Sequence, residues 1–153
     1  MRYQIADEPQ PGGMAHLAVR PVWPLFAIMF GGSWLAFPWF VVNAFAIGCP
    51  NRIKTLVLAI VAFLGAGLLT LGILLTANAL NWDVYAFRYA YLVLLVWKLG
   101  LAYYLMVLQS RTFDLYEHFG GKVANGMLVV VASFFLSRPL LDNLPGWLIL
   151  VVR

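Results

Sequence analysis

The sequence has little charge, one cysteine and two histidines, and these shortages exclude several kinds of site. Only 10% of the 153 residues are charged. The single cysteine, Cys49, cannot form an intrachain disulfide or supply the paired thiols of a quinone-coupled disulfide enzyme. Because His16 and His118 lie outside the long apolar stretches, neither is placed to ligate a haem inside a helix bundle or to activate a nucleophile at membrane depth. We therefore expect a non-enzymatic protein without a cofactor.

The sequence also lacks a basic stripe and a cleavable leader. The net charge is +4, but arginine and lysine occur singly rather than along one face, which argues against nucleic-acid binding. Residues 1–20 include Asp7 and Glu8 and have no compact apolar core behind a basic start, so they do not resemble a signal peptide. We predict that residues 1–21 form a polar, mobile tail.

Apolar residues dominate the rest of the chain. Hydrophobic residues make up 63% of the sequence and the mean hydropathy is +0.88, well outside the range of soluble domains. In lipid the backbone polar groups must be satisfied within the chain, which favours helices. The sequence therefore predicts an all-α integral membrane protein, with residues 22–153 forming a four-helix transmembrane bundle. The expected spans are about 22–48, 54–77, 84–109 and 126–152.

Two of the predicted spans contain helix-breaking residues. Pro38 lies near the middle of the first span, where its missing N–H predicts a kink. The fourth span is interrupted by Arg138, Pro139, Asp142, Asn143, Pro145 and Gly146. We therefore predict a kinked first span and a broken fourth span. The small residues expected to let helices pack closely are Gly32, Ala36, Ala62, Ala66 and Gly72.

Three ionisable residues are expected at mid-membrane depth, where a charge is costly and usually has a purpose. They are Lys98 in the third span, and Arg138 and Asp142 in the fourth. The polar residues expected to support this cluster are Asn43, Asn143 and Arg88. A simpler explanation of Arg88 is that its long side chain reaches the headgroups from near the start of the third span.

The predicted cluster has two interpretations. In the first, the charges lock helices together or hold a partner subunit. In the second, the two cations attract an anion, or Lys98 and Asp142 relay protons, so the protein is a homo-oligomeric channel or transporter. Both place Lys98 close to Asp142, and only the second requires water beside them.

A polar stretch after the third span suggests a weaker alternative. Asp114, Glu117 and His118 have helical spacings that would offer three ligands to a metal ion. A lipid-acting enzyme at the membrane surface would have to use this face. We favour a solvated polar face, because there is one histidine and no second ligand cluster, and so we expect no metal.

The basic loops indicate an orientation. The loops at 49–54 and 110–125 carry most of the lysine and arginine found between spans, so we expect them in the cytoplasm and both termini outside. We expect a bacterial inner membrane. If the fourth segment only dips into the bilayer and returns, the C-terminus is cytoplasmic instead.

Taken with the short soluble parts, these features favour a non-catalytic role. We expect a subunit or accessory component of a larger membrane complex, whose partners are the bilayer and either other membrane subunits or copies of itself.

Overall fold

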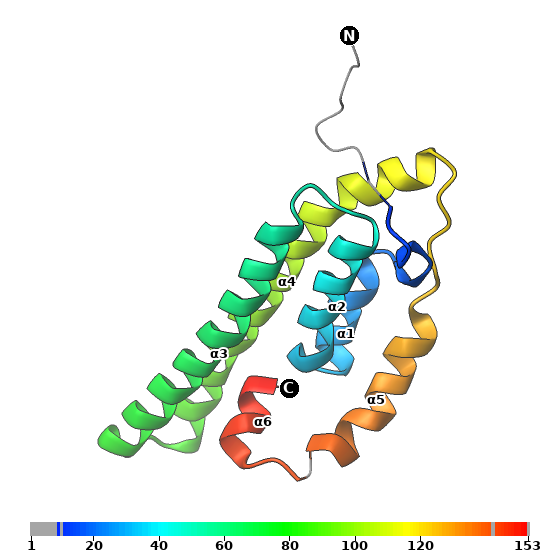
Figure 1. Ribbon diagram of the computed structural model, residues 1–153. Coiled ribbons are helices and arrows are strands. Elements are labelled where there is room, and N and C mark those ends of the chain that lie inside the picture. Colours follow the sequence, from blue (N-terminus) through cyan, green and yellow to red (C-terminus); the bar gives the residue numbers. More distant parts are fainter. Residues whose placement is uncertain (1–8, 10, 142, 153) are drawn as a thin grey trace.

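The computed structural model describes residues 9, 11–141 and 143–152, except the side chains of residues 136 and 138–141. This part of the chain is all-helical. A short 3-10 helix, η1 (Ala15–Leu17), precedes six α-helices, and the helices pack side by side along one long axis (Figure 1). Arg138 has its side chain outside the described residues, and Asp142 lies wholly outside them.

Two long helices form the largest hairpin of the fold. Helices α3 (Arg52–Leu80) and α4 (Val84–His118) are both long and apolar enough to cross a membrane. At 1.5 Å per residue they extend about 44 and 52 Å, against about 30 Å of hydrocarbon in a bilayer. Asn81 ends α3 with a left-handed backbone (φ 47°), and the Asp83 carboxylate caps α4 by accepting from the Ala86 N–H. Helix α4 also includes the polar stretch that follows the predicted third span.

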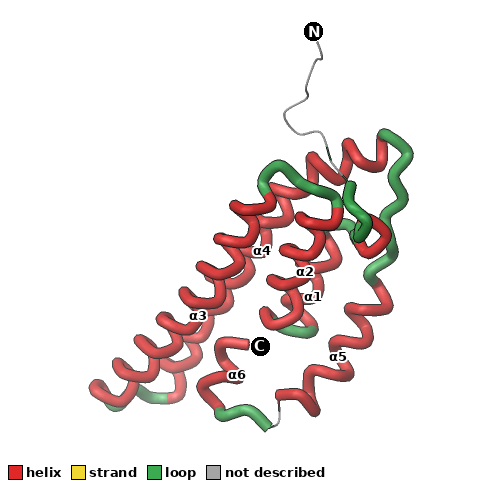
Figure 2. The backbone as a smooth tube through the Cα atoms, in the orientation of Figure 1, coloured by secondary structure: helices red, strands yellow, loops and turns green. Residues whose placement is uncertain are grey.

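The predicted first span is divided into two helices that turn back on each other. Helix α1 (Val22–Phe30) and helix α2 (Ser33–Ala46) form a short antiparallel hairpin, with its turn at residues 31–32 (Figure 2). The Asn43 side chain, near the end of α2, bonds the backbone of Val19, just before α1. The two helices are only about 13 and 21 Å long, so neither crosses 30 Å of hydrocarbon. This arrangement differs from the predicted single kinked span.

The break between α1 and α2 lies at a glycine pair rather than at the proline. Gly32 has φ 101° and ψ 176°, a conformation that is essentially restricted to glycine. Pro38 stays inside α2, where its ring is exposed and the helix continues past it. Gly31 also approaches α5 closely, because a Cβ there would lie 2.7 Å from the Ser133 hydroxyl oxygen. The glycines therefore make both the turn and the contact with the neighbouring helix.

We expect Gly32→Ala to lower the free energy of unfolding by about 1–3 kcal/mol, because alanine is strained at this φ and ψ. Gly72→Ala is the matched control, since Gly72 lies in a regular helix with open space around it and alanine is the better helix former there. Thermal unfolding in detergent, followed by tryptophan fluorescence, measures both variants. Equal stability of the two would contradict the strained turn.

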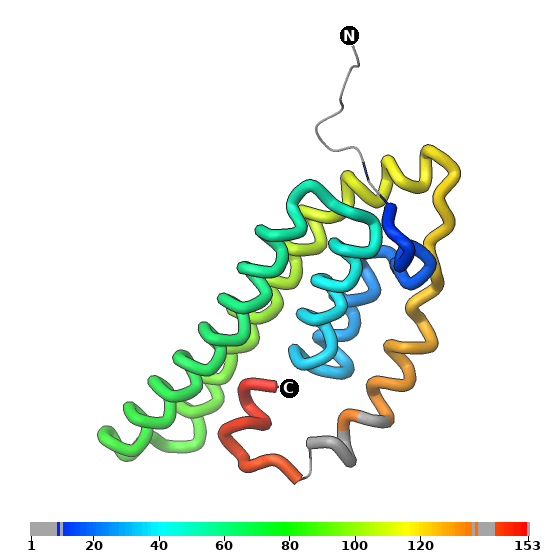
Figure 3. The backbone as a smooth tube through the Cα atoms, viewed as in Figure 1, coloured from blue at the N-terminus to red at the C-terminus, as the bar shows by residue number. Residues whose placement is uncertain are grey.

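The C-terminal part consists of two helices joined by a turn. Helix α5 (Met127–Leu141) runs beside α1, and helix α6 (Gly146–Val152) turns back so that its last residues lie near the turn of the first hairpin (Figure 3). The fourth span is broken as the sequence predicts, but the break lies beyond Pro139. Helix α5 continues through Arg138 and Pro139 to Leu141, and α6 begins after Pro145. Helix α6 is only about 10 Å long, so this segment is not a single crossing helix.

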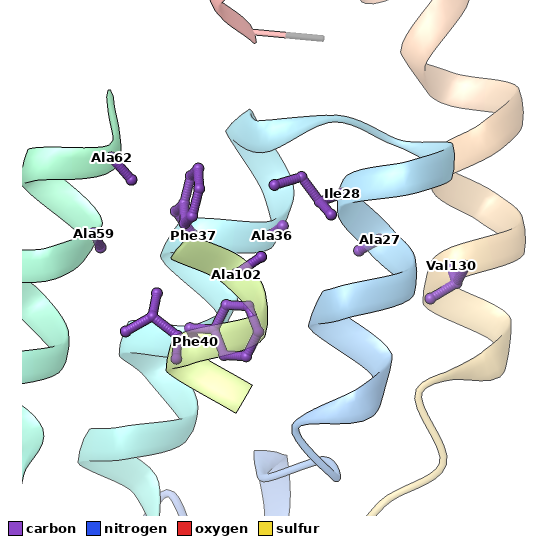
Figure 4. Packing of buried hydrophobic residues seen from close by; sticks show 10 residues of the cluster. Ala27, Ile28, Ala36, Phe37, Phe40, Ala59, Ala62, Ala102 and Val130 are labelled. Carbon is purple, nitrogen blue, oxygen red and sulfur yellow. The ribbon is translucent and has the colours of Figure 1, made fainter. Parts of the chain in front are cut away.

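Small residues allow the first hairpin to pack closely against α3 and α4. Phe37 and Phe40 of α2 are fully buried, and the cluster around them includes Ala59 and Ala62 of α3 and Ala102 of α4 (Figure 4). Among the predicted packing residues, Ala36, Ala62 and Ala66 are buried and Gly32 lies in the turn. Gly72 is exposed, so within the described residues it makes no helix contact of the predicted kind.

The outward faces of α3 and α4 are apolar. Only 22% of the most apolar window of each helix is buried, whereas a core helix of a soluble protein is mostly buried. Leu68 is 70% exposed and Val96 is 69% exposed. Soluble monomers rarely expose continuous apolar surface of this kind, which usually meets lipid or another protein.

Most of the described charges lie at one end of the molecule, which we call the basic end. Its cations are Arg20, Arg52, Lys54, Arg111 and Lys122. The segment before α1 packs at this end, because Gly12 N–H donates to the Ala46 carbonyl and Ala124 N–H donates to that of Ala18. Within residues 11–21, Ala18, Val19 and Pro21 are buried, whereas residues 11–14, 16 and 17 are exposed. Residues 11–21 lie at the same end as the basic loops, not at the opposite end.

Candidate functional site

Lys98 lies on the buried stripe of α4 and is the central residue of the candidate site. The buried residues of this stripe are Leu94, Lys98, Ala102, Leu105, Gln109, Thr112 and Phe113. Lys98 is only 4% exposed, and its Nζ donates to the Leu150 carbonyl oxygen at 2.6 Å. A buried lysine needs such a partner, because an unpaired buried charge is strongly unfavourable. Here the partner is the backbone of α6.

Ser33 binds the next two carbonyls of α6. The Ser33 hydroxyl oxygen lies 2.7 Å from the carbonyl oxygens of both Val151 and Val152, so its single hydrogen is shared between them. The last carbonyls of a helix have no partner within the helix and must find one elsewhere. Lys98 and Ser33 provide those partners inside the protein. We call this group of five residues, Ser33, Lys98, Leu150, Val151 and Val152, the helix-end junction.

The electrostatics of the helix-end junction are favourable. Ser33 is the first residue of α2, so the positive end of that helix dipole faces the negative end of α6. The ammonium group of Lys98 adds a cation beside the same carbonyls. These contacts fix α6 against α2 and α4.

Among the described residues, the structure does not bring Arg88 or Asn143 to Lys98. Arg88 is exposed and lies about 15 Å before Lys98 along α4. Asn143 is exposed in the turn before α6. Arg138 and Asp142, the proposed partners in the charge cluster, belong to the part whose side chains are not described.

Asn43 has a separate role at the basic end of the first hairpin. Its side-chain amide donates to the Val19 carbonyl at 2.8 Å, and its Oδ1 accepts from the Val19 N–H at 3.1 Å. Asn43 is fully buried. Its amide therefore satisfies both the backbone N–H and the backbone C=O of Val19, as a neighbouring β-strand does for the residue that it pairs with.

The polar face predicted near the end of α4 is used for an ion pair with the segment before α1. Glu117 accepts from Arg20 through both carboxylate oxygens, at 2.8 and 2.6 Å. The hydrogen bonds and charge of Glu117 raise the pKa of Arg20. Asp114 and His118 are exposed, and no three His, Cys, Asp or Glu side chains in the described part of the chain are placed to hold a metal ion.

Sequence reasoning missed several polar residues that the structure buries. Gln109 donates from Nε2 to the Phe40 carbonyl at 2.7 Å, and its Oε1 has no partner among the described residues. The Thr55 hydroxyl is also buried and also has no hydrogen-bond partner among the described residues.

Cys49 is buried in the turn before α3, and burial raises the pKa of its thiol to about 11. The glycine and serine at positions 32 and 33 did signal a helix start there, because both residues are frequent N-caps, but not the bonds of Ser33 to α6.

Comparison with known proteins gives no relative from which to carry over a role, because no family model, curated protein or solved structure matches the chain. The helix-end junction is therefore interpreted from its own residues.

Proposed function

We propose that the chain is an integral membrane protein and a non-catalytic subunit or accessory component of a larger membrane assembly. The observation that carries this proposal is the bonding of Lys98. A buried cation whose ammonium group donates to the end of α6 holds that helix in place, which supports a structural role for Lys98.

The surface supports the same proposal. The exposed apolar faces of α3 and α4 have room for contacts with lipid and with other membrane helices. The segments outside the helices are too short to form a domain with its own core. Positive loops favour the cytoplasmic side, so we propose that the basic end, including residues 11–21, faces the cytoplasm.

Native mass spectrometry of the protein, extracted gently from its own membrane, tests the proposal. We expect a stable mass that contains other chains besides this one. A mass made only of copies of this chain would contradict the accessory role and favour a channel or transporter. A monomer that persists under the gentlest extraction would contradict both.

A transport function is the second candidate, and the short helices favour it. Helices that end inside a membrane often line the binding sites of transporters, with their ends facing the solute. In this chain α2 begins and α6 ends at the helix-end junction. On this interpretation α6 would have to move away from Lys98 and leave it facing an anion or a proton path. Flux of chloride or protons into proteoliposomes tests this candidate directly.

A further inference from the structure

A pocket at the basic end has a composition unlike that of the apolar faces. Its volume is about 440 Å³, and it lies between the start of α1, the end of α4 and the loop before α5. It is lined by Arg20, Trp23, Glu117, Gly121, Asn125 and the residues at 123–124. The lining of the pocket therefore combines a cation, a carboxylate, an amide and an indole.

The position of the pocket suits a lipid headgroup. Helix α1 begins at Val22 and α5 begins at Met127, and both starts lie at the same end of the molecule (Figure 1). The pocket lies beside both starts, where these apolar helices leave the polar end. Trp23 lies in the first turn of α1, and tryptophan is enriched at the level where headgroups meet hydrocarbon. Gly126 lets the loop before α5 lie against Trp23, because a Cβ at Gly126 would be only 2.6 Å from the Trp23 ring.

The two charges of the pocket retain unused bonding capacity. Arg20 uses its Nε and one terminal nitrogen for Glu117, although a guanidinium group has five N–H donors. The Arg20 side chain is 63% exposed and that of Glu117 is 29% exposed, so a ligand has access to both. The guanidinium geometry suits a phosphate, and the carboxylate suits an ammonium group.

The charge balance favours a zwitterion over an anion. Arg20 and Glu117 are the charged residues of the lining, and together they are neutral. Of the neighbouring charges, Asp114 lies one turn earlier on α4 and also acts on Arg20, while Lys122 lies between the lining residues Gly121 and Val123. One carboxylate and one cation thus flank the pair, so the charges around the pocket balance and do not select an anionic headgroup. We propose that the pocket binds the glycerophosphoethanolamine group, with its phosphate on Arg20 and its ammonium on Glu117, as the headgroup of phosphatidylethanolamine. The inference shares only the membrane assignment with the proposed function.

Lipid retention tests this proposal. The full chain is reconstituted in vesicles of equal parts phosphatidylethanolamine, phosphatidylglycerol and phosphatidylcholine with identical acyl chains, and retained lipids are identified by native mass spectrometry. We expect the ethanolamine lipid to be enriched, and Arg20→Ala to reduce that enrichment about threefold or more. Glu117→Gln should shift the preference towards phosphatidylglycerol, because it removes the ammonium partner and leaves a net positive pocket.

Lys54→Ala is the matched control, since it removes an exposed cation from the same end without lining the pocket. Equal retention of the three lipids, or enrichment that neither pocket variant changes, would overturn the proposal. If Arg20→Ala does not fold, competition by soluble glycerophosphoethanolamine on the wild-type protein replaces it. Displacement of the retained ethanolamine lipid by this compound supports the headgroup pocket. Absence of displacement, together with a lipid preference that Glu117→Gln leaves unchanged, overturns it.

A separate measurement distinguishes failure of this inference from failure of the membrane assignment. Release of the protein from native membranes by alkaline carbonate would contradict the membrane assignment itself. Retention under carbonate together with unselective lipid binding would contradict the headgroup pocket alone.

Discussion

Asn43→Leu is expected to lower the free energy of unfolding by about 2–4 kcal/mol. The substitution keeps the approximate size of the side chain but leaves the Val19 N–H and C=O buried without partners, and each unsatisfied group costs about 1–3 kcal/mol. The contact joins the end of α2 to the segment before α1, so the first hairpin should open at its base. Thermal unfolding in detergent is the measurement, and the melting temperature should fall by roughly 5–15 °C.

The same substitution at an exposed position separates this effect from the change of residue type. Asn78 is exposed near the end of α3, and Asn78→Leu should leave the melting temperature nearly unchanged. Hydrogen exchange at residues 18–20 gives a local readout, because opening of the hairpin base should expose those amides. If both variants melt alike, the Asn43 amide does not hold the hairpin.

The long helices and the break before α6 could be predicted from the sequence, whereas the first hairpin could not. The stretch 22–48 exceeds the length of one span, and hydrophobicity alone does not distinguish a tilted helix from two short ones. The sequence interpretation took Gly32 with Ala36 as a packing pair and assigned the bend to Pro38. In the structure Gly32 is the turn, because it adopts a φ that other residues avoid, and Pro38 is accommodated on an exposed face.

The burial of Lys98 could be predicted from the sequence, but its hydrogen-bond partner could not. Its spacing with Leu95, Ala102 and Leu105, in steps of three and four, predicts that Lys98 faces protein. Lys98, Ala102 and Leu105 are buried, whereas Leu95 is 40% exposed. The sequence suggested a carboxylate partner, Asp142, which lies outside the described residues. The partner that the structure provides is the carbonyl of Leu150, and backbone carbonyls carry no signature in a sequence. The role of Ser33 was missed for the same reason, since it bonds the same short helix.

Lys98→Met is expected to detach α6 and lower the free energy of unfolding by about 1–3 kcal/mol. Methionine fills much of the same volume but donates no hydrogen bond, so the Leu150 carbonyl loses its partner at a buried helix end. Side-chain hydrogen bonds measured inside membranes average nearer 0.6 kcal/mol, because the unfolded state also finds partners. We expect the larger loss of about 1–3 kcal/mol for two reasons. The Leu150 carbonyl accepts from a charged donor, and it lies in the last turn of α6, where carbonyls have no partner within the helix.

The measurements for Lys98→Met are thermal unfolding in detergent and hydrogen exchange over residues 146–152. Arg88→Met is the matched control, because it removes the same charge from an exposed position on the same helix. Lys98→Gln should recover part of the loss, since glutamine restores a donor without the charge. In the assembly interpretation, destabilisation of α6 is accompanied by weaker association with the partner chains. If Lys98→Met instead keeps its stability and its partners while flux into proteoliposomes changes, Lys98 acts on a transported ion, and the accessory function proposed above is wrong.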